Sequence, residues 1–249
     1  MYFCAIMRLF EGIWGVWAIL FFLLLMTLSL PWLLVNALCF GEKEALKRNI
    51  YFLHRVFSPV FLTLIGIRLR VDGLEHVSTD QPYVLISNHR SILDFIINAV
   101  AFPGVFRFLA KHELRRIPVF GWVVQKMCLT VDRANTASRV QSVVELKKAL
   151  LDGWSIFIYP EGSRNKTREP LAPFYDGAFR IALECQTPVL AQTLLNVQNR
   201  TQGLYLRPGV VHVVWCKPVL PAQHDAASLK EAVRTAMLDV LQNHHPATA

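Results

Sequence analysis

Charged residues are scarce in this chain, and one long segment contains none. Only 18% of the 249 residues are Asp, Glu, Lys or Arg, and 53% are hydrophobic, whereas soluble domains average roughly 25% charged residues. No charged residue lies between Glu11 and Glu42. A composition of this kind does not suit a protein that is surrounded by water on all sides, so we expect part of the chain to lie in lipid.

Sequence features of metal sites, disulfide frameworks and nucleic-acid binding are also missing. The five cysteines are scattered, odd in number and without CxxC spacing, which argues against a zinc site and a disulfide framework. The formal net charge is +8, but no zinc-finger spacing or aromatic RNA-binding motif accompanies it. We therefore assign the basic balance to a membrane surface or an anionic substrate, and not to nucleic acid.

What the chain does have near its start is a long apolar run. Residues 12–41 exceed the roughly 20 apolar residues that a membrane span needs. The run is too long for a signal peptide, and no small-residue cleavage site closes it. Pro31 is expected to kink or end a helix there, and a second apolar stretch covers residues 51–67. The pattern leaves open a spanning helix followed by an interfacial one, or a two-helix hairpin embedded in one leaflet. A buried core helix is the less favoured alternative.

The flanking charges suggest which side of the membrane holds the remainder. Four basic residues follow the apolar run, and only Arg8 precedes it: Lys43, Lys47, Arg48 and Arg55. Basic residues remain preferentially on the cytoplasmic side. We predict membrane-associated helices over residues 1–66, followed by a catalytic domain over residues 67–249 on the cytoplasmic side of the inner membrane.

Beyond residue 66, short β-branched runs alternate with helical patterns. Strands are predicted at residues 67–71, 83–87, 106–110, 129–132, 155–159, 189–195 and 210–217, and helices at 91–101, 120–127, 136–152, 176–185 and 228–243. In the third of these helices, Val140, Val143, Val144 and Leu151 form an apolar face, and Gly153 ends the helix. The pattern predicts an α/β fold, with a mixed, largely buried sheet of about seven strands flanked by helices and an N-terminal membrane-embedded helical motif.

The clearest chemical signal follows the second predicted strand. His89 and Asp94 are five residues apart, so on one continuous helix their directions would differ by about 140°. They can meet only if the chain turns between them, and Ser91 as the helix N-cap would provide the turn. A carboxylate on one imidazole nitrogen leaves the other free to accept a proton from a hydroxyl. Taken alone the pair is weak evidence, because such spacings arise often by chance.

Two further segments carry charge at strand ends. Glu161 and Arg164 emerge after the fifth predicted strand, in a turn marked by Pro160 and Gly162. An arginine there can hold a phosphate through two parallel hydrogen bonds. Lys111 and the arginines at 115–116 follow the third predicted strand, just before an apolar helix. A basic turn beside an apolar helix suits a ligand with an anionic head and an apolar tail.

These segments, in this order, resemble the glycerolipid acyltransferase family that contains the bacterial 1-acylglycerol-3-phosphate acyltransferases. The resemblance rests on NHxxxxD at residues 88–94, Lys-x-Glu-Leu at 111–114, Tyr-Pro-Glu-Gly-Ser-Arg at 159–164, and an apolar block around Pro188. Tyr159 replaces the family's phenylalanine, and Ser163 keeps the hydroxyl of its threonine. Ala191 stands where a second proline is usual, in a region similar to one that is associated with accommodation of the acyl chain.

The resemblance implies a mechanism, its substrates and its site residues. His89, oriented by Asp94, would deprotonate the hydroxyl of a lysophospholipid, by default 1-acyl-sn-glycerol-3-phosphate. The oxygen would then attack the thioester of acyl-CoA or acyl-carrier protein at the membrane, with no metal and no tightly bound cofactor. The resemblance also favours the leaflet-embedded hairpin. Substrate binding is assigned to Asn88, Lys111, Glu161, Gly162, Ser163 and Arg164.

Other functions make different predictions. A thioesterase using the same dyad on water would cleave acyl-CoA without any lysolipid, and an acyltransferase for another lysolipid would need a different head group. A lipid-binding scaffold would not need His89 or Asp94. A nucleic-acid binder would act without lipid and weaken steeply with salt.

Overall fold

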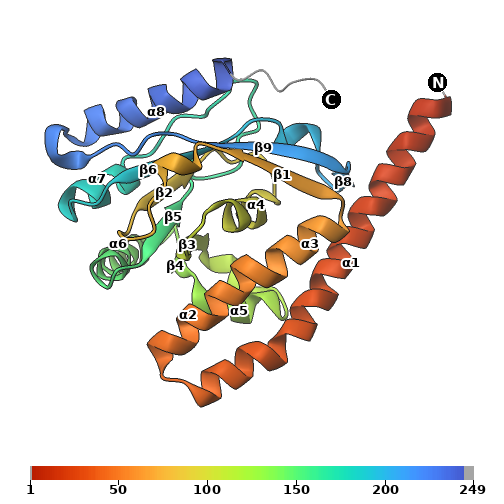
Figure 1. Cartoon of the computed structure of the whole chain (residues 1–249), viewed down its shortest axis with the longest axis horizontal. Helices are drawn as coiled ribbons and strands as arrows, with labels where there is room; N and C mark the ends of the chain where they lie inside the picture. Colours follow the sequence, from red (N-terminus) through yellow and green to blue (C-terminus); the bar gives the residue numbers. More distant parts are fainter. Residues whose placement is uncertain (1, 244–249) are drawn as a thin grey trace.

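The computed structural model describes residues 2–243, with side chains from residue 6 onward, and is built around one central sheet (Figure 1). The strand order is β1-β9-β6-β2-β5-β3-β4. β1 and β9 run parallel to each other, whereas β9 is antiparallel to β6 and the other five strands are mutually parallel. The predicted mixed α/β fold is confirmed, and each predicted strand is present within two residues: β1 (Ile67–Asp72), β2 (Val84–Ser87), β3 (Phe106–Lys111), β4 (Leu129–Val131), β5 (Ser155–Ile158), β6 (Val189–Leu194) and β9 (Gly209–Trp215).

Helices cover both faces of the sheet, which explains the apolar character of its central strands. Every residue of β2, β5 and β6 is buried, and parallel strands covered on both sides read as continuous apolar runs. One face carries α4 (Asp94–Ala101) and the N-terminal helices, and the other carries α6 (Thr136–Leu151), α7 (Gly177–Glu184) and α8 (Ala226–Asn243) (Figure 1). α5 (Phe120–Met127) lies beside α2 (Glu42–Phe52) and β4.

The apolar face predicted for α6 is wrong. Val140, Val144 and Leu151 are 62%, 55% and 79% exposed. The helix instead buries a stripe through Ser142, Leu146, Ala149 and Leu150. The helix has one stripe rich in valine and another that contains Leu146 and Leu150. Only one of them can face the sheet, and the stripe with the two leucines does so. The predicted end of the helix is confirmed, because Gly153 has φ +85° and its N–H bonds to the carbonyl of Leu150.

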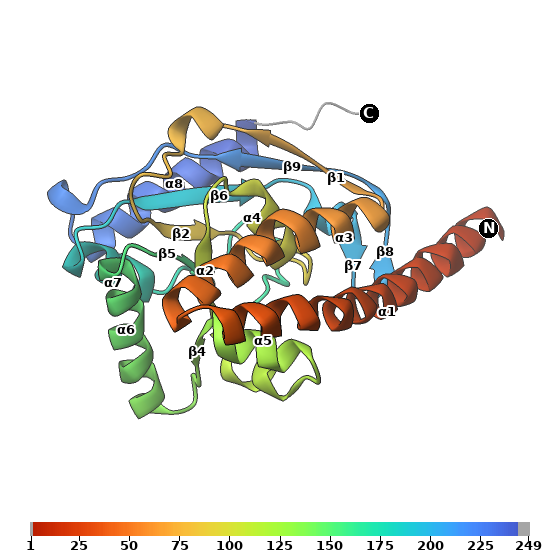
Figure 2. The same ribbon diagram turned by 60° about the horizontal axis from the view of Figure 1, so that its bottom comes forward.

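The N-terminal helices fold back on themselves. α1 (Tyr2–Cys39) continues through Pro31, so the proline does not end it. After Gly41 the chain returns along α1 as α2, a π-helical turn (Leu53–Phe57) and α3 (Ser58–Leu64), as Figure 2 shows. Arg55 in the π-helical turn donates to the carbonyls of Phe102 and Gly104 beyond the end of α4. This helical hairpin is therefore attached to the helix that begins with Asp94.

α1 presents an apolar surface that the rest of the chain leaves open. Residues Ile6–Cys39 are long and apolar enough to cross a membrane by length and composition, and only 22% of their most apolar window is buried. The division predicted at residues 66–67 falls in the turn between α3 and β1. That residues 1–66 and 67–249 are separate domains stays a prediction.

A small hairpin that the sequence did not predict joins α1 to the rest of the molecule. It consists of β7 (Thr201–Gln202) and β8 (Tyr205–Leu206), strands too short to give a periodic signal. The carbonyl oxygen of Leu204 lies so close to Gly15 of α1 that a Cβ there would be 1.6 Å from it. The hairpin also contacts the turn before α4, because the Thr201 hydroxyl donates to the hydroxyl of Ser91 at 2.5 Å.

Candidate active site

Three of the sequence motifs meet at one edge of the sheet. β2, β5 and β3 are neighbouring parallel strands, so their carboxyl ends lie together. Asn88 and His89 follow β2, the segment 159–164 follows β5, and Lys111 closes β3. Strand order therefore assembles groups that are far apart in the chain.

The turn between β2 and α4 is made by Ser91, as predicted, together with Asp94. α4 begins at Asp94, three residues later than expected. Asp94 Oδ2 accepts the main-chain N–H of Arg90 at 2.7 Å and that of Ser91 at 2.8 Å. Ser91 Oγ accepts the N–H of Leu93 at 3.0 Å, as an N-cap side chain does, and also accepts the hydroxyl of Thr201. A carboxylate accepts both amides more strongly than a serine hydroxyl could, because the acceptor is charged.

The expected contact between the imidazole and the carboxylate is present. His89 Nδ1 lies 2.8 Å from Asp94 Oδ2, and the Asp94 side chain is fully buried. The histidine side chain is 20% exposed. Within residues 2–243 no hydrogen bond reaches His89 Nε2. Nδ1 is therefore bonded to Asp94, and Nε2 is available to a ligand at the carboxyl ends of the strands.

An aromatic ring covers one face of this imidazole. The Tyr159 ring stacks on His89 with centroids 4.0 Å apart and planes 17° apart. The Tyr159 hydroxyl accepts a hydrogen bond from Asn98 Nδ2 at 2.9 Å. Burial, and then the negative charge of Asp94, hold the pKa of Tyr159 well above its ordinary value. In the sequence, Tyr159 is distinguished only as a replacement for phenylalanine, and nothing there indicates that its ring contacts His89.

Two residues predicted to bind substrate are directed into the protein. The Asn88 side-chain amide donates to the carbonyl of Leu194 and accepts its N–H, both at 2.8 Å. Glu161 is 4% exposed, and its two oxygens accept the N–H groups of His89 and Ala172. Burial raises the pKa of Glu161, although these two hydrogen bonds act in the opposite direction. Both side chains hold the main chain around His89.

The other predicted residues lie on the surface of the same edge. Gly162 has φ +72°, a conformation that favours glycine, and a Cβ there would be 2.7 Å from the exposed ring of Tyr175. Ser163 and Arg164 are exposed, and Arg164 forms no hydrogen bond or ion pair within the described residues. Lys111 is exposed and pairs with Glu113 at 2.9 Å.

Two arginines at this edge were not predicted from the sequence. The Arg90 guanidinium donates to the carbonyls of Thr167, Glu169 and Pro170, and so holds the loop after Arg164 against the turn that carries His89. Arg133 follows β4, and its Nη1 would be 3.4 Å from a Cβ at Gly162. Arg133 follows a strand just as Arg164 does, which is the signal that could have identified it. No periodic signal marks Arg90.

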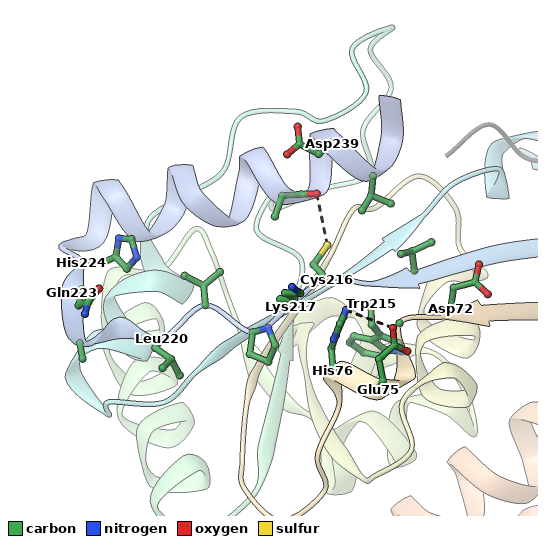
Figure 3. A pocket seen from close by; sticks show the side chains of 17 residues that line it. Asp72, Glu75, His76, Trp215, Cys216, Lys217, Leu220, Gln223, His224 and Asp239 are labelled. Carbon is green, nitrogen blue, oxygen red and sulfur yellow. Dashed lines mark hydrogen bonds and ion pairs between the residues drawn. The ribbon is translucent and has the colours of Figure 1, made fainter. Parts of the chain in front are cut away.

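A cavity of about 750 Å³ lies elsewhere, beside the end of β9 and α8 (Figure 3). Because β9 is antiparallel to β6, its end lies near the amino end of β6, away from His89. Trp215, Lys217, His224 and Asp239 are among its lining residues, and the motifs at residues 88–94, 111–114 and 159–164 contribute none. Within the described part of the chain, no cluster of three or more His, Cys, Asp or Glu residues could hold a metal ion.

Comparison with known proteins places these motifs in a family. The family model described as Acyltransferase matches residues 68–194, about half of the chain. The chain is 30% identical over 189 residues to mouse 1-acyl-sn-glycerol-3-phosphate acyltransferase alpha. The matched region covers 72% of this chain and 65% of the relative. It is 33% identical over 161 residues to a chloroplastic 1-acyl-sn-glycerol-3-phosphate acyltransferase of Brassica napus, covering 62% of this chain and 46% of the relative.

A solved structure shares the fold over nearly the whole chain. The 1-acyl-sn-glycerophosphate acyltransferase PlsC from Thermotoga maritima superimposes with a TM-score of 0.82, covering 98% of this chain and 99% of that one at 19% identity. The curated relatives named above are longer, and the chain spans only about half to two thirds of their length.

Proposed function

The chain belongs to the Acyltransferase family, and from that premise we propose that it transfers a fatty acyl group from a thioester donor to the free hydroxyl of 1-acyl-sn-glycerol-3-phosphate. The observation that carries the proposal is the contact of 2.8 Å between His89 Nδ1 and Asp94 Oδ2 at the carboxyl end of β2. The acceptor is proposed because the matched relatives are named for that substrate.

In the proposed reaction His89 acts as the general base. Nε2 accepts the proton of the acceptor hydroxyl while its oxygen attacks the thioester carbonyl carbon. Asp94 stabilises the imidazolium that forms and keeps Nδ1 protonated. When the tetrahedral intermediate collapses, the carbon–sulfur bond breaks and the thiolate takes the proton from His89. The products are phosphatidic acid and the free thiol of CoA or of the carrier protein, and the proposal requires neither a metal nor a bound cofactor.

Exposed cations near Gly162 are proposed to hold the acceptor phosphate. Arg164 lies two residues after Gly162, Arg133 approaches Gly162 from the end of β4, and Lys111 closes the neighbouring strand β3. Guanidinium groups bind phosphate oxygens through paired, charge-assisted hydrogen bonds. In this proposal Asn88 and Glu161 act indirectly, because their polar atoms are already bonded to the main chain.

We also propose that the helical hairpin of α1 to α3 is embedded in one leaflet of the inner membrane, with the catalytic domain on its cytoplasmic side. Support comes from the exposed apolar surface of α1 and from the return of α2 and α3 along it, because helices that lie along one membrane surface can bury an apolar face while the charged residues at the start of α2 stay in the head-group region. The basic residues after the apolar run favour the cytoplasmic side.

The test is to incubate the detergent-solubilised protein with an acyl-CoA, with and without 1-acyl-sn-glycerol-3-phosphate, while measuring free thiol and lipid product. The expected result is thiol release that needs the lysolipid and yields phosphatidic acid. Release without the lysolipid would replace the proposal with a thioesterase. If neither acyl-CoA nor acyl-carrier protein yields phosphatidic acid, the proposed function is wrong.

A further inference from the structure

Tyr159 stands out because the third motif of the family usually has phenylalanine at this position. Its ring is fully stacked on the imidazole of His89, with centroids 4.0 Å apart. The extra hydroxyl is accommodated in the interior by a hydrogen bond from Asn98, whose side chain is fully buried. A buried hydroxyl without a partner would be costly, so the tyrosine and the asparagine depend on each other.

The contact with Asp94 alone does not determine the plane of the imidazole. The hydrogen bond at Nδ1 restricts the χ1 and χ2 torsions of the histidine, but a hydrogen bond tolerates tens of degrees of misalignment, so the ring can still tilt about χ2. Such rotation would swing Nε2 away from an incoming hydroxyl. The near-parallel Tyr159 ring, 17° from the plane of the imidazole, opposes that rotation because tilting either ring would bring their atoms into collision.

Both restraints on His89 originate from the same helix. Asp94 and Asn98 are one helical turn apart on α4, so their side chains share a face. Asp94 bonds to the edge of the imidazole, and Asn98 bonds to the tyrosine that covers its face. Packing supports the tyrosine further, because its ring also contacts those of Phe108 and Phe157.

We propose that Tyr159 is a positioning residue that holds the plane of the His89 imidazole, and that Asn98 holds Tyr159 in place. The proposal rests on the proposed function in assigning the reactive nitrogen to His89 Nε2. The electron-rich face of the phenol ring also favours the imidazolium that forms when His89 accepts a proton. Tyr159 does not itself exchange a proton in this scheme, since its hydroxyl is engaged with Asn98 and its pKa lies well above the ordinary value.

Four variants separate positioning from a general loss of packing. Y159F keeps the ring, Y159L removes it, N98L removes the donor, and Y159F/N98L removes donor and hydroxyl together. A matched control is F102L, because Phe102 is a buried ring that packs edge-on against Phe106 and at a tilt against Trp215, and not against His89. Thermal unfolding is recorded for each variant, and kinetics are measured well below its unfolding temperature.

Transfer kinetics give the first readout. We expect Y159L to lower kcat about 100-fold with little change in either KM, because a small misplacement of a reacting group has an effect of that order. Y159F should stay within about threefold of the wild-type kcat because its ring still packs against Phe108 and Phe157, although it should lower the unfolding temperature, since the buried Asn98 amide loses its partner. F102L should also stay within about threefold in kcat. N98L should lower kcat, and Y159F/N98L should recover it, because no unpaired hydroxyl remains. A Y159L protein with wild-type kcat, or one that changes only the acceptor KM, would overturn the proposal.

Nuclear magnetic resonance of the histidine ring protons gives a second readout that does not need activity. Stacking should shift the His89 ring resonances upfield in the wild type and in Y159F, and Y159L should abolish the shift. Absence of the shift in the wild type would overturn the positioning role even if transfer is observed. If the shift is present but His89→Ala transfers acyl groups normally, the proposed mechanism fails while the stacking contact stands.

Discussion

The carboxylate of Glu161 accepts the main-chain N–H of His89 at 2.7 Å. In the same segment, the N–H of Asn165 donates to the carbonyl of His89 at 2.6 Å. Both main-chain groups of the histidine are therefore bonded to the loop after β5. This arrangement joins the first and third motifs into one unit, and it explains why a glutamate is buried next to the proposed phosphate site.

Glu161 should make the stability of the protein depend on pH. Burial raises its pKa in the folded protein, so its contribution to stability is complete below the ordinary value of about 4.5 and is lost as pH rises through the raised value. We expect the wild type to lose more stability than E161Q across this window. The measurement is the unfolding temperature of both proteins against pH, and parallel curves would contradict the prediction.

His89→Ala should reduce acyl transfer by at least about 100-fold, which is the lower range for removal of a general base. The fold should be nearly unaffected because the side chain is partly exposed. His112→Ala is the matched control, since His112 lies in the 3-10 helix after β3 (His112–Arg116). Initial rates of thiol release with lysolipid present check both variants. Equal losses in the two would show that the effect is not specific to the dyad.

Arg164→Ala should raise the KM for the lysolipid about tenfold, because a charge-assisted hydrogen bond to phosphate would be lost. The KM for the acyl donor should change little. Arg168→Ala serves as the control, being another exposed arginine of the same loop. Steady-state kinetics with each substrate varied in turn make the comparison. An acceptor KM unchanged in Arg164→Ala would remove this residue from the phosphate site.

Gln192→Met should stabilise the protein by about 1 kcal/mol. The Gln192 side chain on β6 is fully buried, and neither polar atom of its amide has a hydrogen-bond partner among the described residues. Methionine has a similar shape and no such polar atoms. Denaturant unfolding checks the change. Gln141→Met on the exposed side of α6 is the control, and a destabilised Gln192→Met would show that the buried amide is satisfied in solution.

Gly15→Ala should destabilise the contact between α1 and the β7–β8 hairpin. The new Cβ would lie 1.6 Å from the carbonyl oxygen of Leu204, and overpacking of this kind costs about 1–3 kcal/mol. Within a helix the same substitution would otherwise stabilise by roughly 0.5–1 kcal/mol. Gly41→Ala is the control, because no atom lies within 4 Å of its added Cβ. Thermal unfolding in detergent that ranks Gly15→Ala as equally stable would contradict the close contact.

Much of the fold was evident in the sequence because local patterns reflect it directly. Strands buried on both faces read as apolar runs, and all seven strands of the main sheet were located from such runs. The spacing of residues 88–94 and the order of the motifs identified the family, since each motif is a short continuous segment. The length of the uncharged run likewise predicted the long apolar helix α1.

The tertiary structure decided which groups surround His89. Asn98 and Tyr159 are 61 positions apart, Glu161 is 72 from His89, and Thr201 is 110 from Ser91. Hydrophobic periodicity describes only neighbours along the chain, so it could not show that Glu161 is directed inward or that α6 buries its leucine stripe. These features follow from strand order and from competition for space against the sheet, and both exist only once the chain has folded.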